Sequence, residues 1–350
     1  MLKKLLLFTL VLTTLLAVGC GKSEDFSELS TPAITASEDT SSVAEPVLYE
    51  NPLTGVKEVE EDFRNLRPVA VMVNNYQSAQ EVQCGLHQAD IVYEAYVEGG
   101  ISRLMAVFYD LSQVGQLGTI RSARNSFVYL AQGLDAVYAH HGVDNVYTKP
   151  YMRSIGLDDY NVGYVSGDSF RESNGKAWEH TLYTTGEKLM GALTKKEWRL
   201  KNDHTTPNAF VFAQEPRTPA NPCTSVEFNM SSEYVSKFVY DQSSGKYTRT
   251  IQGETHKDYK NSTPTQVTNL FVLYANTVTY PDNKHVVTEY DKGKGIYVSA
   301  GGYQPITWEK GDPEDPLQFY DESGKELQVN PGSSWIAFPQ KRNESKTVIQ

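Results

Sequence analysis

Short apolar runs separated by glycine, asparagine and proline dominate the chain from about residue 51 onward, and this pattern predicts a structure rich in β-strands. The first clear run, Val69 to Val73, is opened by a proline and closed by two asparagines, so we expect a buried strand there. From about residue 223 the strand signals take over, and they include hairpins with Ser-Gly turns.

Two apolar runs between residues 91 and 108 flank the dipeptide Gly99-Gly100, which is a strong signal for a two-residue hairpin turn. With these glycines as the turn, Tyr96 pairs with Arg103. Strand alternation then gives the hairpin one purely apolar face, and the charged side chains share the other face. These charged residues are Glu94, Glu98 and Arg103.

Helical spacing replaces this alternation after the segment GTIRSAR, where apolar residues at 127, 130, 131 and 134 predict a helix. Ser122 and Asn125 are both candidates for its N-cap, so Arg121 and Arg124 lie where the helix begins. A second helix is predicted from Thr184 toward residue 198, because a glutamate three residues after this threonine completes a capping box.

Together these patterns predict an α+β protein of layered β-sheets with helices. The length of 350 residues suffices for two domains. We expect a mixed N-terminal domain over residues 51–215 and a β-rich C-terminal domain over residues 223–345.

The first 19 residues differ from the rest in having two lysines followed by an uncharged apolar run, which is typical of a secretory signal peptide. The run ends at Gly19 before Cys20 and resembles the bacterial lipoprotein signal, in which the cysteine becomes the acylated first residue. An ordinary cleaved signal with an incidental cysteine is the alternative. Residues 20–50 are rich in Ser, Thr, Glu and Pro, which predicts a disordered tether.

Acylation of Cys20 would make the lipid bilayer a partner of this protein and place the chain outside the cytoplasm. Loss of the signal changes the net charge from −11 to −13, and so acidic a chain is not expected to bind nucleic acid. Cys84 and Cys223 then remain, and in this compartment they can form one disulfide or stay free.

Arg121 and Arg124 at the predicted helix start, together with Arg103, could bind a phosphate or carboxylate, with Ser122 beside them. Alternatively the arginines pair with Glu94 and Glu98 and only stabilise the fold, since buried charges need partners. The two glutamates as a catalytic acid pair are a third possibility, which the adjacent arginine disfavours because it keeps both ionised.

A second candidate cluster lies in the segment YTRTIQGETHKD. Arg249, His256 and Asp258 fall in one strand and loop and could bind a ligand, or hold the loop through local hydrogen bonds. No spacing indicates a metal site, a cofactor or a catalytic motif.

The segments RPVAVMVNN, GLHQADIVYEAYVEGGISRLMAVF and GTIRSAR followed by HHG, and later the spaced Arg249, His256 and Asp258, resemble the YerB-like lipoproteins of Gram-positive bacteria. The resemblance covers about residues 51–338 and implies two regions of unknown function in a mixed α and β architecture. It carries over no catalytic residues.

The sequence therefore predicts a lipoprotein on the outer face of the cell membrane of a Gram-positive cell. The leading hypothesis is that it binds an anionic cell-wall component or an envelope protein, and no catalytic residue is assigned. The alternative is a transferase or hydrolase that acts on phosphate-containing or glycan wall polymers.

Overall fold

The computed structural model describes residues 47–350 apart from 61–62, 64, 203–208 and 233. The predicted signal peptide, Cys20 and nearly all of the tether lie outside the described residues. Among the described helices, none has the length and apolar character needed to cross a membrane.

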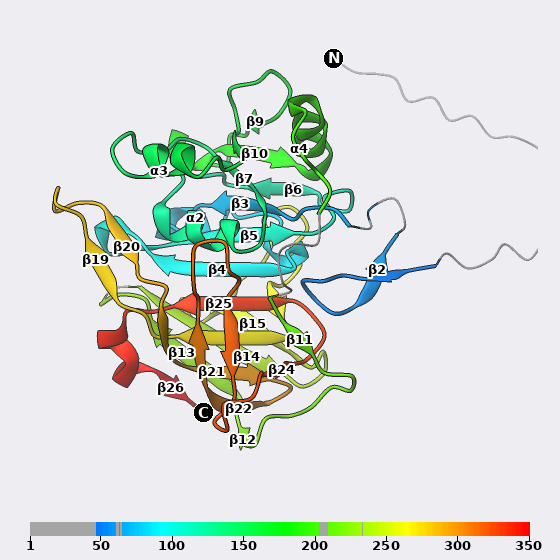
Figure 1. Cartoon of the computed structure of the whole chain (residues 1–350), viewed down its shortest axis with the longest axis vertical. Coiled ribbons are helices and arrows are strands. Elements are labelled where there is room, and N and C mark those ends of the chain that lie inside the picture. The colour runs from blue at the N-terminus through cyan, green and yellow to red at the C-terminus, as the bar shows by residue number, and fades with distance from the viewer. Residues whose placement is uncertain (1–46, 61–62, 64, 203–208, 233) are drawn as a thin grey trace, which may run out of the picture. The chain divides into compact units, whose positions relative to one another are not determined.

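The central feature is a mixed sheet of eleven strands, in which β23 (Gln318–Tyr320) pairs with β22 off the main path (Figure 1). The order along the main path is β12 (Asn221–Pro222), β22 (Gly302–Glu309), β21 (Lys292–Ser299), β18 (Asn269–Leu273), β25 (Ser334–Phe338), β4 (Ile91–Tyr96), β5 (Ser102–Phe108), β3 (Val69–Val73), β7 (Val137–His140) and β8 (Asp159–Asn161).

The N- and C-terminal halves of the chain share this sheet. Strand β25, near the C-terminus, pairs in parallel with β4, with Ser334 opposite Ile91 and Phe338 opposite Ala95. Every residue of β25 is buried. Because the backbone hydrogen bonds of the sheet run without a break from one half to the other, the two halves form one structural unit.

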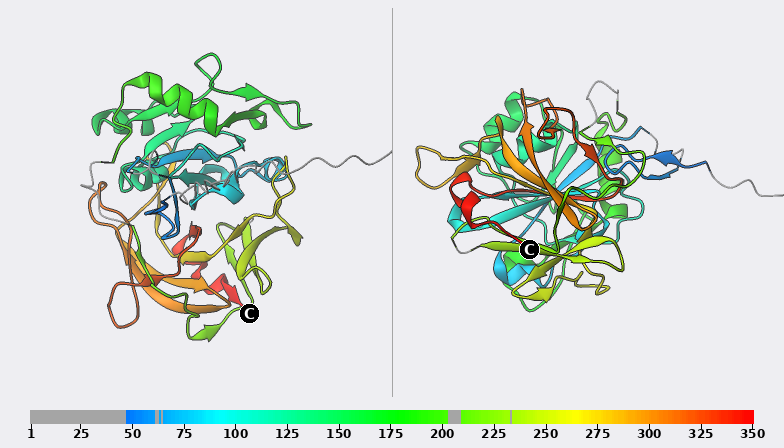
Figure 2. Two further views of the ribbon diagram at one scale, coloured as in Figure 1. Left: turned by 90° about the vertical axis from the view of Figure 1, so that its right-hand side faces the viewer. Right: turned by 90° about the horizontal axis from the view of Figure 1, so that it is seen from below.

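A second sheet of six strands covers one face of the central sheet (Figure 2). Phe238 of β14 packs edge-on against Trp335 of β25, with ring centroids 5.2 Å apart. The strands of this sheet are β16 (Glu254–Thr255), β15 (Lys246–Ile251), β14 (Val235–Asp241), β13 (Ser225–Asn229) and β26 (Val348–Ile349), with β17 (Gln266–Val267) paired to β15.

Four α-helices and several small sheets complete the described fold. Helix α2 packs on the face of the central sheet opposite the second sheet, and α4 packs on the same face as that sheet. The helices are α1 (Gln77–Gln80), α2 (Asn125–Gln132), α3 (Thr148–Ser154) and α4 (Gly186–Leu193).

The small sheets are β1–β2 (Tyr49–Glu50, Lys57–Val59), β6–β10–β9 (Gln116–Gly118, Leu182–Thr185, Phe170–Arg171), β11–β24 (Val211–Phe212, Gln328–Val329) and β19–β20 (Thr277–Thr279, Val286–Thr288).

The α+β class with layered sheets and the buried strand β3 are confirmed. The predicted register of the β4–β5 hairpin is wrong by one residue. Ala95, and not Tyr96, lies opposite Arg103, because the loop has three residues and Val97 donates its N–H to the carbonyl of Ile101 at 2.9 Å. This slip moves Arg103 to the opposite face of the sheet from Glu94.

The predicted helix starts also need correction. The N-cap of α2 is Arg124, without a side-chain cap, and so neither Ser122 nor Asn125 has that role. In α4 the cap is Thr185, whose hydroxyl accepts a hydrogen bond from the N–H of Lys188 at 3.2 Å. The predicted capping box at Thr184 is therefore wrong by one residue, and the helix stops at Leu193, short of residue 198.

The two remaining cysteines are free thiols, both buried. Burial, with the negative charge of Asp258, raises the pKa of Cys84 to about 12. Such a thiol stays protonated at neutral pH and is a poor nucleophile.

The first turn of α4 leaves no space for a side chain at Gly186. A Cβ there would lie 1.9 Å from the carbonyl oxygen of Leu111, whereas a Cβ at Gly191 of the same helix meets nothing within 4 Å. We expect Gly186→Ala to lower the free energy of unfolding by about 2 kcal/mol or more, because backbone has to move. Gly191→Ala, the matched control, should raise it by about 0.5–1 kcal/mol. Urea denaturation measures both, and equal effects of the two substitutions would contradict this packing.

Candidate functional site

The carboxyl ends of strands β3, β4, β7 and β8 lie at the same end of the central sheet. Strands β3, β7 and β8 are parallel to one another, and β3 and β4 are both antiparallel to the β5 that lies between them. We call this place the carboxyl end of the sheet. In open sheets with parallel strands, the loops that follow such ends are the usual location of ligand sites.

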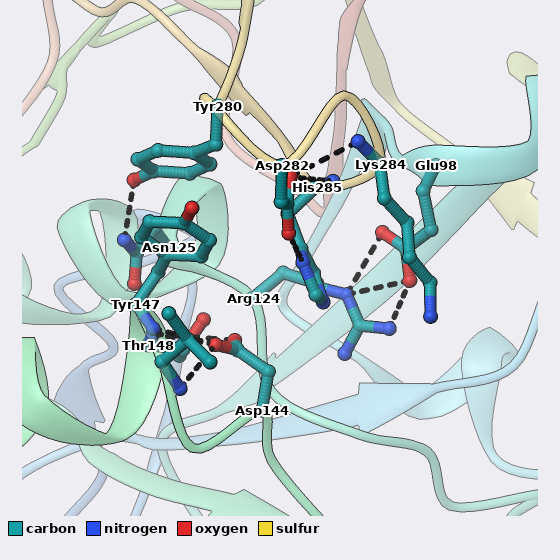
Figure 3. A network of polar contacts seen from close by, with 11 residues as sticks. Glu98, Arg124, Asn125, Asp144, Tyr147, Thr148, Tyr280, Asp282, Lys284 and His285 are labelled. Atoms are coloured by element: carbon teal, nitrogen blue, oxygen red, sulfur yellow. Dashed lines mark hydrogen bonds and ion pairs between the residues drawn. The ribbon is translucent and has the colours of Figure 1, made fainter.

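A glutamate–arginine pair stands at the carboxyl end of the sheet. The Nε of Arg124, at the N-cap of α2, donates to both carboxylate oxygens of Glu98 at 2.8 and 2.9 Å, and its Nη2 forms a further contact (Figure 3). Burial alone would raise the pKa of Glu98, but the hydrogen bonds and charge of Arg124 lower it to about 2. The carboxylate is therefore ionised at neutral pH.

Arg103 acts electrostatically on this pair and is almost fully buried. Its Nη1 donates to the carbonyl oxygen of Ser122 at 3.0 Å. Burial and the nearby charge of Arg124 lower the pKa of Arg103 to about 9, and the charge of Glu98 opposes this shift. Arg103 is thus a cation at neutral pH that fixes the loop before α2.

Arg121 differs from the other two arginines in lacking a hydrogen-bond partner for its side chain among the described residues. Its backbone is fixed between two strand ends, because its N–H donates to Met72 and its carbonyl accepts from His141, both at 3.0 Å. Its Nε is buried without a partner. Burial lowers the pKa of Arg121, and the negative charge of Glu179 opposes the shift.

The β19–β20 hairpin, from the C-terminal half, reaches the start of α2 beside this site (Figure 3). The Nδ2 of Asn125 donates to the hydroxyl of Tyr280 at 2.6 Å, and the ring of Tyr280 stacks on Tyr147 at 4.1 Å. At the hairpin tip, His285 contacts Asp282 at 2.6 Å. Both halves of the chain therefore contribute to the carboxyl end of the sheet.

Glu94 lies on the other face of the sheet and is completely buried. Its carboxylate accepts hydrogen bonds from Ser102 at 2.6 Å, from Ser236 at 3.0 and 3.1 Å, and from the indole N–H of Trp335 at 3.1 Å. The amide of Asn75 approaches at 3.4 Å. We call this group, together with Arg249, the Glu94 cluster.

Arg249 is the buried cation of the Glu94 cluster. It donates to the side-chain oxygens of Asn75 at 2.9 Å and Gln83 at 3.2 Å, and its guanidinium lies 4.9 Å from the ring centre of Trp335. Burial lowers the pKa of Arg249, and the charge of Glu94 opposes this effect. These contacts bind β4, β15 and β25 together and leave the cluster enclosed.

His256 and Asp258 continue this polar layer toward the loop that precedes β4. The Nε2 of His256 lies 3.1 Å from the carbonyl oxygen of Gln80, so this nitrogen carries the proton. The carboxylate of Asp258 accepts the N–H of Gly85 at 2.7 Å and contacts His87 at 3.2 Å. Both side chains are buried and hold one half of the chain to the other.

The residues that the sequence singled out thus fall into two groups. The structure brings five of them together at the carboxyl end of the sheet: Glu98, Arg103, Arg121, Ser122 and Arg124. Glu94, Arg249, His256 and Asp258 lie on the other face, in the contact between the halves. Sequence reasoning missed the partners of both groups, such as Trp335 and Tyr280, because they come from distant segments without a local signal. Among the described residues, no cluster of three or more His, Cys, Asp or Glu could hold a metal ion.

Two family models match the chain. The N-terminal domain of a family described as a protein of unknown function (DUF3048) matches residues 53–199, and the C-terminal domain of that family matches residues 225–336. YerB of Bacillus subtilis (strain 168), which is named as a predicted lipoprotein, is 31% identical over 291 residues, or 81% of this chain and 84% of YerB. The crystal structure of YerB from Bacillus subtilis matches with a TM-score of 0.74 and 28% identity, over 86% of this chain and 99% of that one.

The Glu94 cluster makes a strong prediction about stability. Glu94→Leu would leave the buried donors around residue 94 without an acceptor and the charge of Arg249 without its countercharge. We expect it to lower the free energy of unfolding by about 3–5 kcal/mol, as measured by urea denaturation at pH 7. Glu227→Gln is the control, because Glu227 pairs with Lys237 at 3.6 Å on the surface, and its loss should cost less than about 1 kcal/mol. A loss of that small size for Glu94→Leu would show that the cluster is not a structural requirement.

A second prediction concerns acid pH. Burial and the nearby Arg249 lower the pKa of His256 to about 3, so between about pH 6.5 and 3 only the unfolded chain binds this proton. The contribution of His256 to stability is therefore complete above about pH 6.5 and is lost as the pH falls toward 3.

The variant His256→Gln keeps a donor for Gln80 but does not titrate. We expect the stability of the protein relative to this variant to fall by about 2 kcal/mol between pH 7.5 and pH 5. Other groups cancel in this difference, including Asp90, whose pKa burial raises to about 7. If this difference in stability does not change with pH, folded His256 binds the proton as readily as the unfolded chain does, and its pKa is not lowered.

Proposed function

The chain belongs to the DUF3048 family of YerB-like lipoproteins, and from this premise we propose that it binds an anionic component of the cell envelope at the carboxyl end of the sheet, while acylated Cys20 anchors it on the outer face of the membrane. The membrane anchor rests on the sequence of the first 20 residues and on the name of YerB. The ligand class rests on the arginines.

Arg121 carries the proposal. The guanidinium of Arg121 has no hydrogen-bond partner among the described residues and its Nε is buried, so it loses hydration without a replacement. The buried Nε of Arg249 also lacks a partner, but the Nη atoms of that arginine are bound to Asn75 and Gln83. A bound phosphate or carboxylate would supply the missing acceptor and could take two parallel hydrogen bonds from the guanidinium.

The neighbours of Arg121 favour an anion over a cation. Three arginines, at 103, 121 and 124, and two glutamates, at 98 and 179, act on one another electrostatically, so this group of five has a net positive charge in a chain whose net charge is negative. Because Arg124 is bound to Glu98 and Arg103 to the loop carbonyl, these two have their places fixed before a ligand arrives. Such preorganisation reduces the ordering that binding requires.

Arg121→Gln tests this proposal. We expect the substitution to weaken binding of a phosphate-bearing polyanion, such as oligo(glycerol phosphate), by at least about tenfold, because a charge-assisted hydrogen bond contributes about 1.5–3 kcal/mol. The melting temperature should change little, since no described side chain loses a hydrogen bond from Arg121. Calorimetric titration of the purified protein measures the first quantity and a thermal melt the second.

Arg153→Gln is the control, because Arg153 is an exposed arginine in the last turn of α3. Equal binding by all three proteins would contradict the anion site. A fall of many degrees in the melting temperature of Arg121→Gln would instead make Arg121 a structural residue, and the search would move to protein partners.

A further inference from the structure

Three exposed aromatic side chains belong to loops at or next to the carboxyl end of the sheet, where Arg121 lies. Among the described residues, four tyrosine and tryptophan side chains are exposed: Tyr76, Tyr164, Trp178 and Tyr259. Tyr164 is 71% exposed and Trp178 is 70% exposed. The first three come from loops that follow, or contact, the carboxyl ends of β3 and β8. Rings that are exposed at one end of the sheet, with no function in the core, are available for contact with a ligand.

The strand order places two of these rings on either side of Arg121. Tyr76 follows β3 and stacks on His180, with ring centroids 5.7 Å apart, and His180 accepts a hydrogen bond from Asn74 at 2.6 Å. Arg121 itself is held between the ends of β3 and β7. Tyr164 follows β8, with its ring 5.6 Å from that of His141, the residue whose N–H binds the Arg121 carbonyl.

Trp178 stands next to the same group. The guanidinium of Arg171 lies 3.9 Å from the centre of its ring and also donates to its backbone oxygen at 2.7 Å. The arginine fixes the indole in one orientation while most of the side chain stays exposed. The residues that follow are Glu179, whose charge acts on Arg121, and His180.

The composition of this surface decides between kinds of ligand. The centre of a protein–protein interface is enriched in tyrosine, tryptophan and arginine, as this surface is, but it is more apolar than its rim and depleted of residues such as glutamate. Here a half-buried arginine, Arg121, and an exposed glutamate, Glu179, lie among the loops that carry the rings. A sugar ring matches such a surface, since it has an apolar C–H face that packs on an aromatic ring and a rim of hydroxyl groups that bind polar side chains.

We infer that the ligand is a glycan that carries phosphate or carboxylate groups, with its sugar rings on Tyr76, Tyr164 and Trp178 and an acidic group on Arg121. This inference rests on the proposed function, because both use Arg121. It goes further in stating that the ligand contains rings as well as charge, so a polyanion without sugar rings should bind more weakly.

The test compares three probes on the purified full-length protein by calorimetric titration. The probes are a phosphorylated N-acetylglucosamine oligosaccharide, the same oligosaccharide without phosphate, and an oligo(glycerol phosphate) of equal charge. We expect the first to bind tightest. Tyr164→Ala and Trp178→Ala should each weaken it by about tenfold, the upper range for one aromatic contact, and should leave oligo(glycerol phosphate) unchanged.

Tyr259→Ala is the matched control, since this tyrosine is 37% exposed and, within the described residues, contacts neither Arg121 nor the three other rings. It should change no affinity, and unchanged melting temperatures show that the variants fold. Equal affinity for both polyanions, unaffected by loss of the rings but reduced by Arg121→Gln, would overturn the glycan inference and leave the anion site standing. Binding of no polyanion, or of the neutral oligosaccharide alone, would overturn both.

Discussion

The fold depends on the requirement that a carboxylate buried in the middle of a sheet must have donors on every side. Glu94 is completely excluded from solvent, and an ion in that position is stable only with hydrogen bonds and a countercharge. Its own half of the chain supplies Ser102. The indole of Trp335, the hydroxyl of Ser236 and the charge of Arg249 come from the other half. Neither half can therefore bury Glu94 alone, and the parallel pairing of β25 with β4 is the backbone counterpart of the same dependence.

This arrangement separates the charges that hold the fold from those that are open to a ligand. The Glu94 cluster is enclosed on one face of the sheet, while Glu98, Arg121 and Arg124 lie at the carboxyl end of the sheet. Two of the three arginines there are committed to internal partners. Among these three, only Arg121 has a buried nitrogen without an acceptor in the described structure. Arg121 is therefore the residue that we expect to bind the anion, and Arg103 and Arg124 lie in fixed positions near it.

The sequence was sufficient for the fold class, for strand β3 and for the position of the arginines before α2. It was not sufficient for the hairpin register, because both faces of β4 and β5 are buried and the apolar pattern therefore fits either register. Gly99 and Gly100 both adopt positive φ, but within a loop of three residues, and a two-residue turn could not be distinguished from it by composition. The partners of Glu94 were out of reach for another reason: Ser236 and Trp335 lie 142 and 241 residues away, and only the tertiary pairing brings them together.

The net charge of the chain sets a further condition on the proposed site. A protein of net charge −11, or −13 after loss of the signal, repels polyanions at long range, although salt confines this repulsion to about 8–10 Å under physiological conditions. Attraction by the few arginines at the carboxyl end of the sheet therefore acts only at contact distance, where Glu98 and Glu179 weaken it. A ligand held by charge alone would gain little at such a site. Aromatic contacts do not depend on net charge. A ligand that packs on the exposed rings at the carboxyl end of the sheet therefore gains affinity that a simple polyanion does not have.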